Sequence, residues 1–163
     1  MSFIKYIGAA LLLVGAYIFI SRYKRYLTLR VEESESFLRL VEHLRAEISC
    51  RLTPLGELLC LYTDEALERV GFLPFVREGV GVNEAYSRCE RGLSVGREGQ
   101  EILRRLFAEL GRRYKAETLA TLDRAREELG AYTARLESEL SDDVKLAGAM
   151  AFGAAVGLSL LLL

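Results

Sequence analysis

The segment 115–163 constrains the fold of this chain more than any other. Leu122, Leu129 and Leu136 recur there at every seventh position. Further apolar residues lie beside them at helical spacing: Leu119, Ala125, Tyr132 and Leu140. This spacing places them on one stripe of an α-helix. From Leu146 to the end the chain has no charged residue, and a helix of that length approaches the ~30 Å thickness of the hydrocarbon core of a bilayer. We therefore expect an amphipathic helix that runs into a transmembrane helix over residues 146–163.

The other end of the chain is apolar as well. Residues 3–20 carry one charge, that of Lys5, which lies close enough to the end to reach the membrane interface. A cleavable signal peptide is the alternative, but no A-x-A pattern follows the apolar run. Basic residues follow instead: Arg22, Lys24, Arg25 and Arg30. The sequence thus predicts an uncleaved N-terminal anchor.

The same basic residues set the expected orientation. Lysine and arginine concentrate on the cytoplasmic side of membrane spans, so the chain after Ile20 should lie in the cytoplasm. We predict an N-terminal transmembrane anchor over 1–21, a cytoplasmic helical bundle over 22–145 and a C-terminal transmembrane helix over 146–163. Both chain ends would then face away from the cytoplasm.

Charge and cysteine content exclude several classes of function. The chain has 22 basic and 23 acidic side chains, a mixed and nearly neutral surface without the basic excess of nucleic-acid-binding proteins. There are three cysteines, no CxxC motif and a single histidine, His43, which is too little for a zinc site. We expect reduced, mostly buried thiols, and a packing or surface role for His43.

The middle of the chain is predicted to be a series of helices. Phe37, Val41, Leu44 and Ile48 indicate a helix over about 31–50. Thr53 and Pro54 form a helix start, because a threonine hydroxyl caps free amides and proline suits the first turn. No segment alternates like a strand, so we predict an all-α fold.

Shorter helices should follow. Leu55, Leu58, Leu59 and Tyr62 share one helical face. We expect Asp64 to cap a turn that runs toward Gly71, and Phe72, Phe75 and Val76 to form a short helix that ends near Gly79. Asn83 should cap a helix over 84–91, and residues 92–99 should form an exposed joint. The last predicted helix before 115–163 is marked by these apolar residues and by Gly111 at its end: Ile102, Leu103, Leu106, Phe107 and Leu110.

No catalytic motif is present. The chain lacks a P-loop, an HExxH pair and a serine or cysteine nucleophile motif with a nearby base. We therefore predict a protein that is not an enzyme, uses no cofactor and has no small-molecule substrate.

Two packing questions stay open at the level of sequence. Ala149, Gly153 and Gly157 lie four residues apart, a pattern that lets helices approach closely in lipid but that also arises from composition alone. The stripe from Leu119 to Leu140 can pack inside the bundle or form a parallel coiled-coil dimer. The second arrangement would suit a self-associating membrane tether or signalling adaptor.

Taken in order, the features resemble the stage III sporulation protein AB family of endospore-forming bacteria. The most specific match is Leu44-Arg45-Ala46-Glu47-Ile48 followed by Thr53-Pro54-Leu55, which is similar to the family's L-x-x-E-I helix end and T-P-L turn. Residues 107–111 resemble a second family motif that ends in Leu-Gly. Ala85-Tyr86 departs from the family's frequent Ala-Trp, and Arg112 stands where an acidic residue is usual.

The resemblance implies a role in the channel that joins mother cell and forespore. It implies a cytoplasmic bundle similar to the platform protein of type II secretion systems, a place in the mother-cell membrane, and two kinds of partner: a cytoplasmic secretion-type ATPase, stage III sporulation protein AA, and other channel subunits. Because loops on rigid scaffolds often carry recognition, we expect the partner-binding residues to be Arg51, Thr53, Pro54 and Leu55, with the joint 92–99 next.

Overall fold

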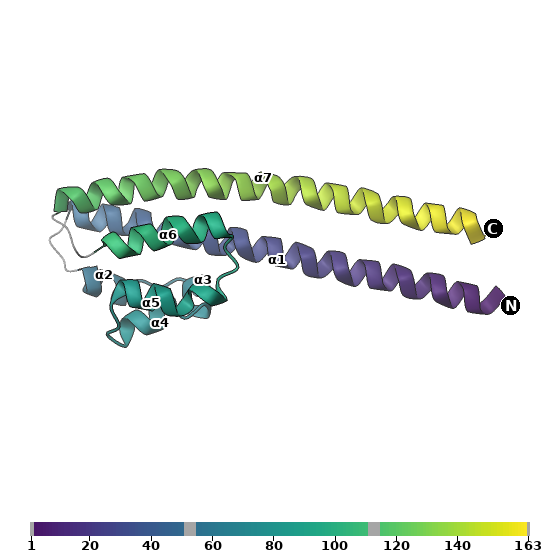
Figure 1. Cartoon of the computed structure of the whole chain (residues 1–163), viewed down its shortest axis with the longest axis horizontal. Helices are drawn as coiled ribbons and strands as arrows, with labels where there is room; N and C mark the ends of the chain where they lie inside the picture. The colour runs from purple at the N-terminus through teal and green to yellow at the C-terminus, as the bar shows by residue number, and fades with distance from the viewer. Residues whose placement is uncertain (1, 51–54, 111–114, 163) are drawn as a thin grey trace. The chain divides into compact units, whose positions relative to one another are not determined.

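The computed structural model describes residues 2–50, 55–110 and 115–162, and every regular element in these ranges is helical (Figure 1). The elements are α1 (Ser2–Cys50), α2 (Leu55–Leu61), α3 (Glu65–Arg69), α4 (Phe72–Arg77), α5 (Val82–Cys89), the 3₁₀ turn η1 (Glu90–Gly92), α6 (Arg97–Glu109) and α7 (Lys115–Leu162). The predicted all-α class is confirmed.

The chain divides into two compact units. The terminal unit combines Met1–Thr28 with Leu136–Leu163, and the central unit is Leu29–Arg135. Helices α1 and α7 each contribute to both units. The predicted boundaries at 21/22 and 145/146 concern membrane insertion, and they stay predictions.

Helix α1 is longer than the sequence pattern indicated. We expected an anchor and a separate helix over about 31–50, but one helix covers Ser2–Cys50. The intervening residues 21–30 contain neither glycine nor proline, so nothing in that stretch stops a helix.

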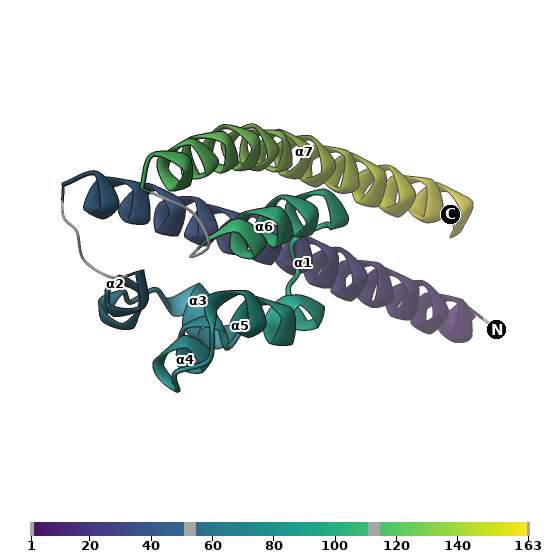
Figure 2. The same ribbon diagram turned by 60° about the vertical axis from the view of Figure 1, so that its left-hand side comes forward.

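The core of the central unit is a cluster of four aromatic rings. Phe37, Phe72, Tyr86 and Phe107 are fully buried, and the closest pair of ring centroids, Phe72 and Phe107, lies 5.0 Å apart. They come from α1, α4, α5 and α6, so one cluster joins a long helix to the short ones. Figures 1 and 2 show α1 and α6 of this unit lying between α7 and the short helices α2–α5.

The leucine stripe of α7 is buried inside the chain. Leu122 and Leu129 are fully buried, and Ala125 and Tyr132 are nearly so. Leu136, in the terminal unit, is also buried, while Leu119 and Leu140 are half-buried. Internal packing, one of the two arrangements left open by the sequence, is therefore the one observed.

Two glycines shape the chain between the short helices. Gly71 and Gly79 both have positive φ, 86° and 83°. Glycine adopts this backbone conformation without steric strain because it has no Cβ. Gly71 precedes α4, and Gly79 follows it, as the sequence indicated. Asp64 caps α3 by accepting bonds from the amides of Ala66 and Leu67, which confirms its predicted role.

The predicted start of α5 is wrong. The helix begins at Val82, with Gly81 as its N-cap, so Asn83 lies inside it. The Gly81 carbonyl already accepts a bond from the Ala85 amide at 2.8 Å, so the backbone after Gly79 sets the start and no side-chain cap is needed. α5 also ends at Cys89 rather than Arg91, and a 3₁₀ turn follows.

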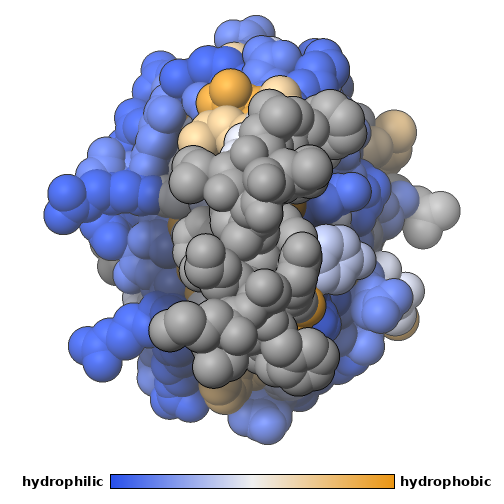
Figure 3. Space-filling view, turned by 90° about the vertical axis from the view of Figure 1, so that its right-hand side faces the viewer, coloured by the Kyte–Doolittle hydropathy of each residue, from blue (hydrophilic) through white to orange (hydrophobic). Residues whose placement is uncertain are grey.

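In the terminal unit, Leu27 and Leu136 are buried, and the Tyr23 hydroxyl donates to Asp143 Oδ2 at 3.0 Å. Several large apolar side chains are exposed there: Val14, Tyr17, Ile18, Leu146 and Met150. The face drawn in Figure 3 is otherwise mostly hydrophilic around the atoms shown in grey. Over the described residues, no helix combines the length and the apolar character needed to cross a membrane. The two spans stay predictions from the sequence.

Candidate functional site

The predicted partner-binding turn is only partly visible. Arg51, Thr53 and Pro54 lie outside the described residues. Leu55 is the half-buried first residue of α2. In Figures 1 and 2 the end of α1 lies at the same end of the central unit as the start of α7. The helix-capping role of Thr53 and Pro54 therefore stays a prediction.

The small-residue stripe of α7 is open in this chain. Ala149, Gly153 and Gly157 are exposed. A Cβ added at Gly153 or Gly157 would meet no atom within 4 Å. Packing of this stripe against another helix stays a prediction.

The second predicted contact segment, the joint 92–99, is not an exposed loop. Leu93, Val95 and Gly99 are buried, and α6 already begins at Arg97. The Ser94 amide donates to the buried carboxylate of Glu33 on α1 at 2.6 Å. The expectation of exposure therefore holds only in part: Gly92, Arg97 and Glu98 are exposed, but the residues between Gly92 and Arg97 pack against α1 and α7.

Two of the three glycines of this joint, Gly96 and Gly99, lie in close contact with neighbouring side chains, whereas a Cβ at Gly92 would meet no atom within 4 Å. A Cβ at Gly96 would lie 2.4 Å from Arg30 Nη2, and one at Gly99 would lie 2.5 Å from Val95 Cγ1. The Gly96 amide also donates to the Tyr132 hydroxyl at 3.0 Å. The joint is thus a packed seam, and we do not retain it as a recognition loop.

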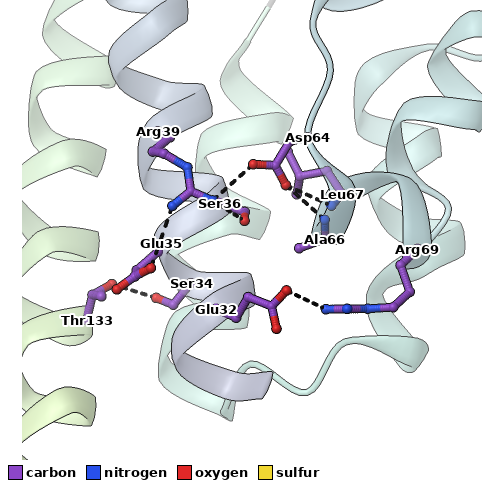
Figure 4. Close-up of polar contacts among 10 residues, drawn as sticks. All are labelled: Glu32, Ser34, Glu35, Ser36, Arg39, Asp64, Ala66, Leu67, Arg69 and Thr133. Atoms are coloured by element: carbon purple, nitrogen blue, oxygen red, sulfur yellow. Dashed lines mark hydrogen bonds and ion pairs between the residues drawn. The ribbon is translucent and has the colours of Figure 1, made fainter. Parts of the chain in front are cut away.

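A polar junction fixes the short helices to α1, as Figure 4 shows. Asp64 accepts bonds from the Ala66 and Leu67 amides with one oxygen and from Arg39 Nη2, at 3.0 Å, with the other. Arg39 also donates to Ser36 at 2.7 Å. A second ion pair, Arg69 with Glu32 at 3.2 Å, joins the same two helices.

The junction favours the charged forms of its members. Burial opposes ionisation of Asp64, but hydrogen bonds from the Leu67 amide, Arg39 and Ser36 outweigh it, and the pKa of Asp64 lies below its ordinary value. The hydrogen bond to Asp64 raises the pKa of Arg39. Asp64 therefore carries its charge at neutral pH, as a structural ion pair and helix cap.

On another face of α1, a buried hydroxyl pair joins it to α7 within the central unit. Ser34 Oγ and Thr133 Oγ1 lie 2.7 Å apart, and Thr133 donates to the Leu129 carbonyl at 2.9 Å. Both side chains are therefore satisfied in an otherwise apolar contact.

The segment after α2 is held by Arg77 of α4. Its guanidinium donates to the carbonyls of Cys60, at 3.4 Å, and Tyr62, at 2.9 Å, and to Glu68 at 2.9 Å. The Tyr62 ring packs on His43 with ring centroids 5.1 Å apart, which agrees with a packing role for that histidine. The backbone on both sides of Leu61 is thereby fixed.

Leu61 itself points outward and is 82% exposed. It belongs to the outer strip of α2, which we call the α2 edge: Gly56, Glu57, Cys60 and Leu61, all exposed. Leu58 and Leu59 occupy the buried side of the same helix. The predicted apolar face of this segment contained Leu55, Leu58, Leu59 and Tyr62, and Leu61 was given no role. At about 100° per residue, Leu61 falls outside that face and lies beside Glu57.

The hollow between α6 and α7 is too small for a ligand. Its volume is about 40 Å³, and its apolar floor is formed by Ile102, Leu106 and Ala125. Arg105 and Glu128, which also line the hollow, form an ion pair at 3.2 Å. Small-molecule sites usually measure about 300–1,000 Å³, whereas this volume accommodates roughly one water molecule.

The cysteines differ more than predicted. Cys89 is buried, and burial raises its pKa to about 12, so its thiol is unreactive. Cys50 and Cys60 are exposed, because they occupy the last turn of α1 and the outer strip of α2. All three are free thiols, but the expectation that most would be buried was wrong. The described residues contain no group of three or more side chains able to hold a metal ion.

Comparison with protein families gives a match over nearly the full chain. The model described as stage III sporulation protein AB matches residues 5–163, which is essentially the whole chain. Comparisons with curated proteins and with solved structures found no match. The match therefore includes both apolar ends as well as the central unit.

Proposed function

The chain belongs to the stage III sporulation protein AB family, and we propose that it is a non-enzymatic membrane platform of the mother-cell-to-forespore channel in endospore formation. Membership itself assigns the chain to sporulation, in a family that is not known as an enzyme family. The proposal adds a mechanism: the platform couples a cytoplasmic secretion-type ATPase to the membrane assembly.

One observation carries the proposal. Both helices that run on into the apolar chain ends also supply core residues of the central unit. Phe37 and Leu44 of α1, and Leu122 and Leu129 of α7, are fully buried there. A displacement of the bundle would therefore act on two helices that lead toward the predicted anchors.

The anchors themselves are proposed on the sequence. Residues 3–20 carry one charge and residues 146–163 none, and a basic cluster follows the first run. This arrangement supports a cytoplasmic position of the central unit, within reach of an ATPase.

The rival function, a tether that dimerises through its leucine stripe, is disfavoured. Leu122 and Leu129 are fully buried within a single chain. A parallel coiled coil through these residues would first have to open the central unit and expose its core.

Co-purification tests the coupling. Full-length tagged protein is isolated in detergent from sporulating cells, and associated proteins are identified by mass spectrometry. We expect stage III sporulation protein AA and other channel subunits, and none of them with an equally tagged, unrelated two-span protein. Recovery of the intact chain without the ATPase would contradict the coupling.

Thiol labelling tests the orientation. The exposed Cys60 is a native reporter, whereas a cysteine at Gly96 would collide with Arg30. Cys60 should resist a membrane-impermeant thiol reagent in intact cells and react after permeabilisation. Cys89, being buried, should stay unlabelled in both conditions. Labelling of Cys60 in intact cells would contradict the orientation.

A further inference from the structure

The α2 edge is the outer side of a short amphipathic helix. Glu57 and Leu61 are four residues apart and so lie on the same side, as do Gly56 and Cys60 beside them. A Cβ at Gly56 would meet no atom within 4 Å, so the α2 edge is also open at its first residue. Nothing among the described residues covers the Leu61 side chain, which is 82% exposed.

This leucine is exposed on a fixed backbone. Arg77 holds the carbonyls of its two neighbours, and Asp64, three residues on, is bound to Arg39. An apolar side chain on an ordered segment loses little conformational entropy when a partner covers it. Complete burial of such a side chain in an apolar pocket of a partner would contribute favourably to binding.

The charges around the edge indicate what kind of surface fits it. Residues 55–78 contain five acidic and two basic side chains. Both basic ones are engaged within the chain, Arg69 with Glu32 and Arg77 with Glu68. The acidic residues that have no ion-pair partner among the described residues are all exposed: Glu57, Glu65 and Glu78.

We propose that the α2 edge is a docking surface for a partner protein that receives Leu61 in an apolar pocket flanked by lysine or arginine, with Glu57 facing those basic side chains. The pairing follows from an exposed apolar anchor beside unpaired negative charge. The inference rests on the proposed function in one respect, because the ATPase is the first partner to test.

The same charges disfavour two other occupants. A symmetric dimer through this edge would place each Glu57 close to its copy across the two-fold axis, where like charges repel. An anionic membrane surface would repel the unpaired glutamates as well. Both occupants remain outcomes of the test.

Binding of purified stage III sporulation protein AA to the full-length chain in detergent is the first measurement. Leu61→Ala and Glu57→Lys should each weaken binding by about tenfold or more, as expected for an interface anchor and its charged neighbour. Glu127→Lys makes the same charge change at an exposed position on α7 and should leave the affinity unchanged. Circular dichroism verifies that each variant is folded. Equal binding by all variants would overturn the docking surface and leave the proposed function standing.

If the wild-type chain fails to bind the ATPase, the coupling in the proposed function fails, and a second measurement decides the docking surface. A photo-crosslinking amino acid replaces Leu61 in the full-length chain in sporulating cells. A crosslink to a lysine- or arginine-lined site of another protein, lost when Glu57→Lys is added and kept with Glu127→Lys, supports the surface. Crosslinks to lipid, to a second copy, or to nothing overturn it.

Discussion

Two segments of the central unit connect short helices, but they differ in how far their apolar side chains are buried. In the joint 92–99, Leu93 and Val95 are buried, and the amides of Ser94 and Gly96 bond to Glu33 of α1 and Tyr132 of α7. Segment 60–64 contains the end of α2 and the turn after it. Arg77 bonds to the Tyr62 carbonyl and Arg39 to Asp64, but Leu61 is exposed to solvent. Order and exposure are therefore separate properties, and only the second segment is both fixed and open.

Glycines show the same contrast. Gly96 and Gly99 lie where a single Cβ would overlap Arg30, Tyr132 or Val95. Gly56 lies on the α2 edge with no atom near its missing Cβ. In the joint, glycine permits close approach of backbone and side chains, whereas on the α2 edge it leaves part of a surface bare.

The largest difference should appear between a buried and an exposed leucine. Leu129→Ala removes a fully buried side chain from the central unit and should destabilise the protein by about 2–5 kcal/mol. Leu61→Ala, at a position that is 82% exposed, should leave stability nearly unchanged. Thermal unfolding of both full-length variants in detergent, followed by circular dichroism, measures the contrast. Similar midpoints would mean that the stripe of α7 is not core.

The next effect tests the enclosed joint. Gly99→Ala places a methyl group 2.5 Å from Val95 Cγ1 and 2.7 Å from Tyr132 Cε1, and we expect a loss of about 1–3 kcal/mol from overpacking. Combining it with Tyr132→Leu, which removes part of the obstruction but also the hydroxyl that binds Gly96, shows whether Tyr132 is the obstacle. A fully stable Gly99→Ala would indicate that the joint is looser than the structure shows.

These contrasts also show what the sequence could and could not reveal. Helical period identified the all-α class, the stripe of α7 and the α6 core, because one apolar face of each helix is buried. Asp64 was recognisable as a cap, since a cap bonds to amides two and three residues on. The ion pair of Asp64 with Arg39 could not be predicted from the sequence, because Arg39 is 25 positions away and no local pattern indicates the contact.

The joint was misjudged for a similar reason. Gly92, Ser94, Gly96 and Gly99 have the composition of a flexible loop, and only the fold shows that Glu33 and Tyr132 meet its amides. Leu61 falls outside the predicted apolar face of α2, and no local pattern shows whether another element covers it. Burial of Leu58 and Leu59 leaves the outer leucine exposed only after α2 is placed.

A smaller effect concerns the polar attachment of the open turn. Asp64→Ala removes the cap of α3 and the partner of Arg39, and should cost about 0.5–2 kcal/mol at neutral pH. Asp64→Asn keeps an oxygen for the cap and should lose less. Because the folded pKa of Asp64 lies below its ordinary value, its contribution is complete above about pH 4 and declines as the pH falls further.

The pH dependence separates the carboxylate from the cap. The difference in unfolding midpoint between wild type and Asp64→Asn should therefore shrink on acidification below about pH 4. Between about pH 4 and neutral pH, the difference in unfolding midpoint should stay constant. If the difference in unfolding midpoint persists at the lowest pH, the charge of Asp64 is not what stabilises the protein.

The smallest effect is expected at Gly56, the counterpart of Gly99. Alanine at this position meets no atom within 4 Å and belongs to a helix, so it should stabilise the protein by about 0.4–1 kcal/mol by limiting the unfolded chain. Gly56→Ala should raise the unfolding midpoint slightly, whereas Gly99→Ala lowers it. If both substitutions destabilise, the α2 edge is covered in the folded protein, and the contrast between the two segments disappears.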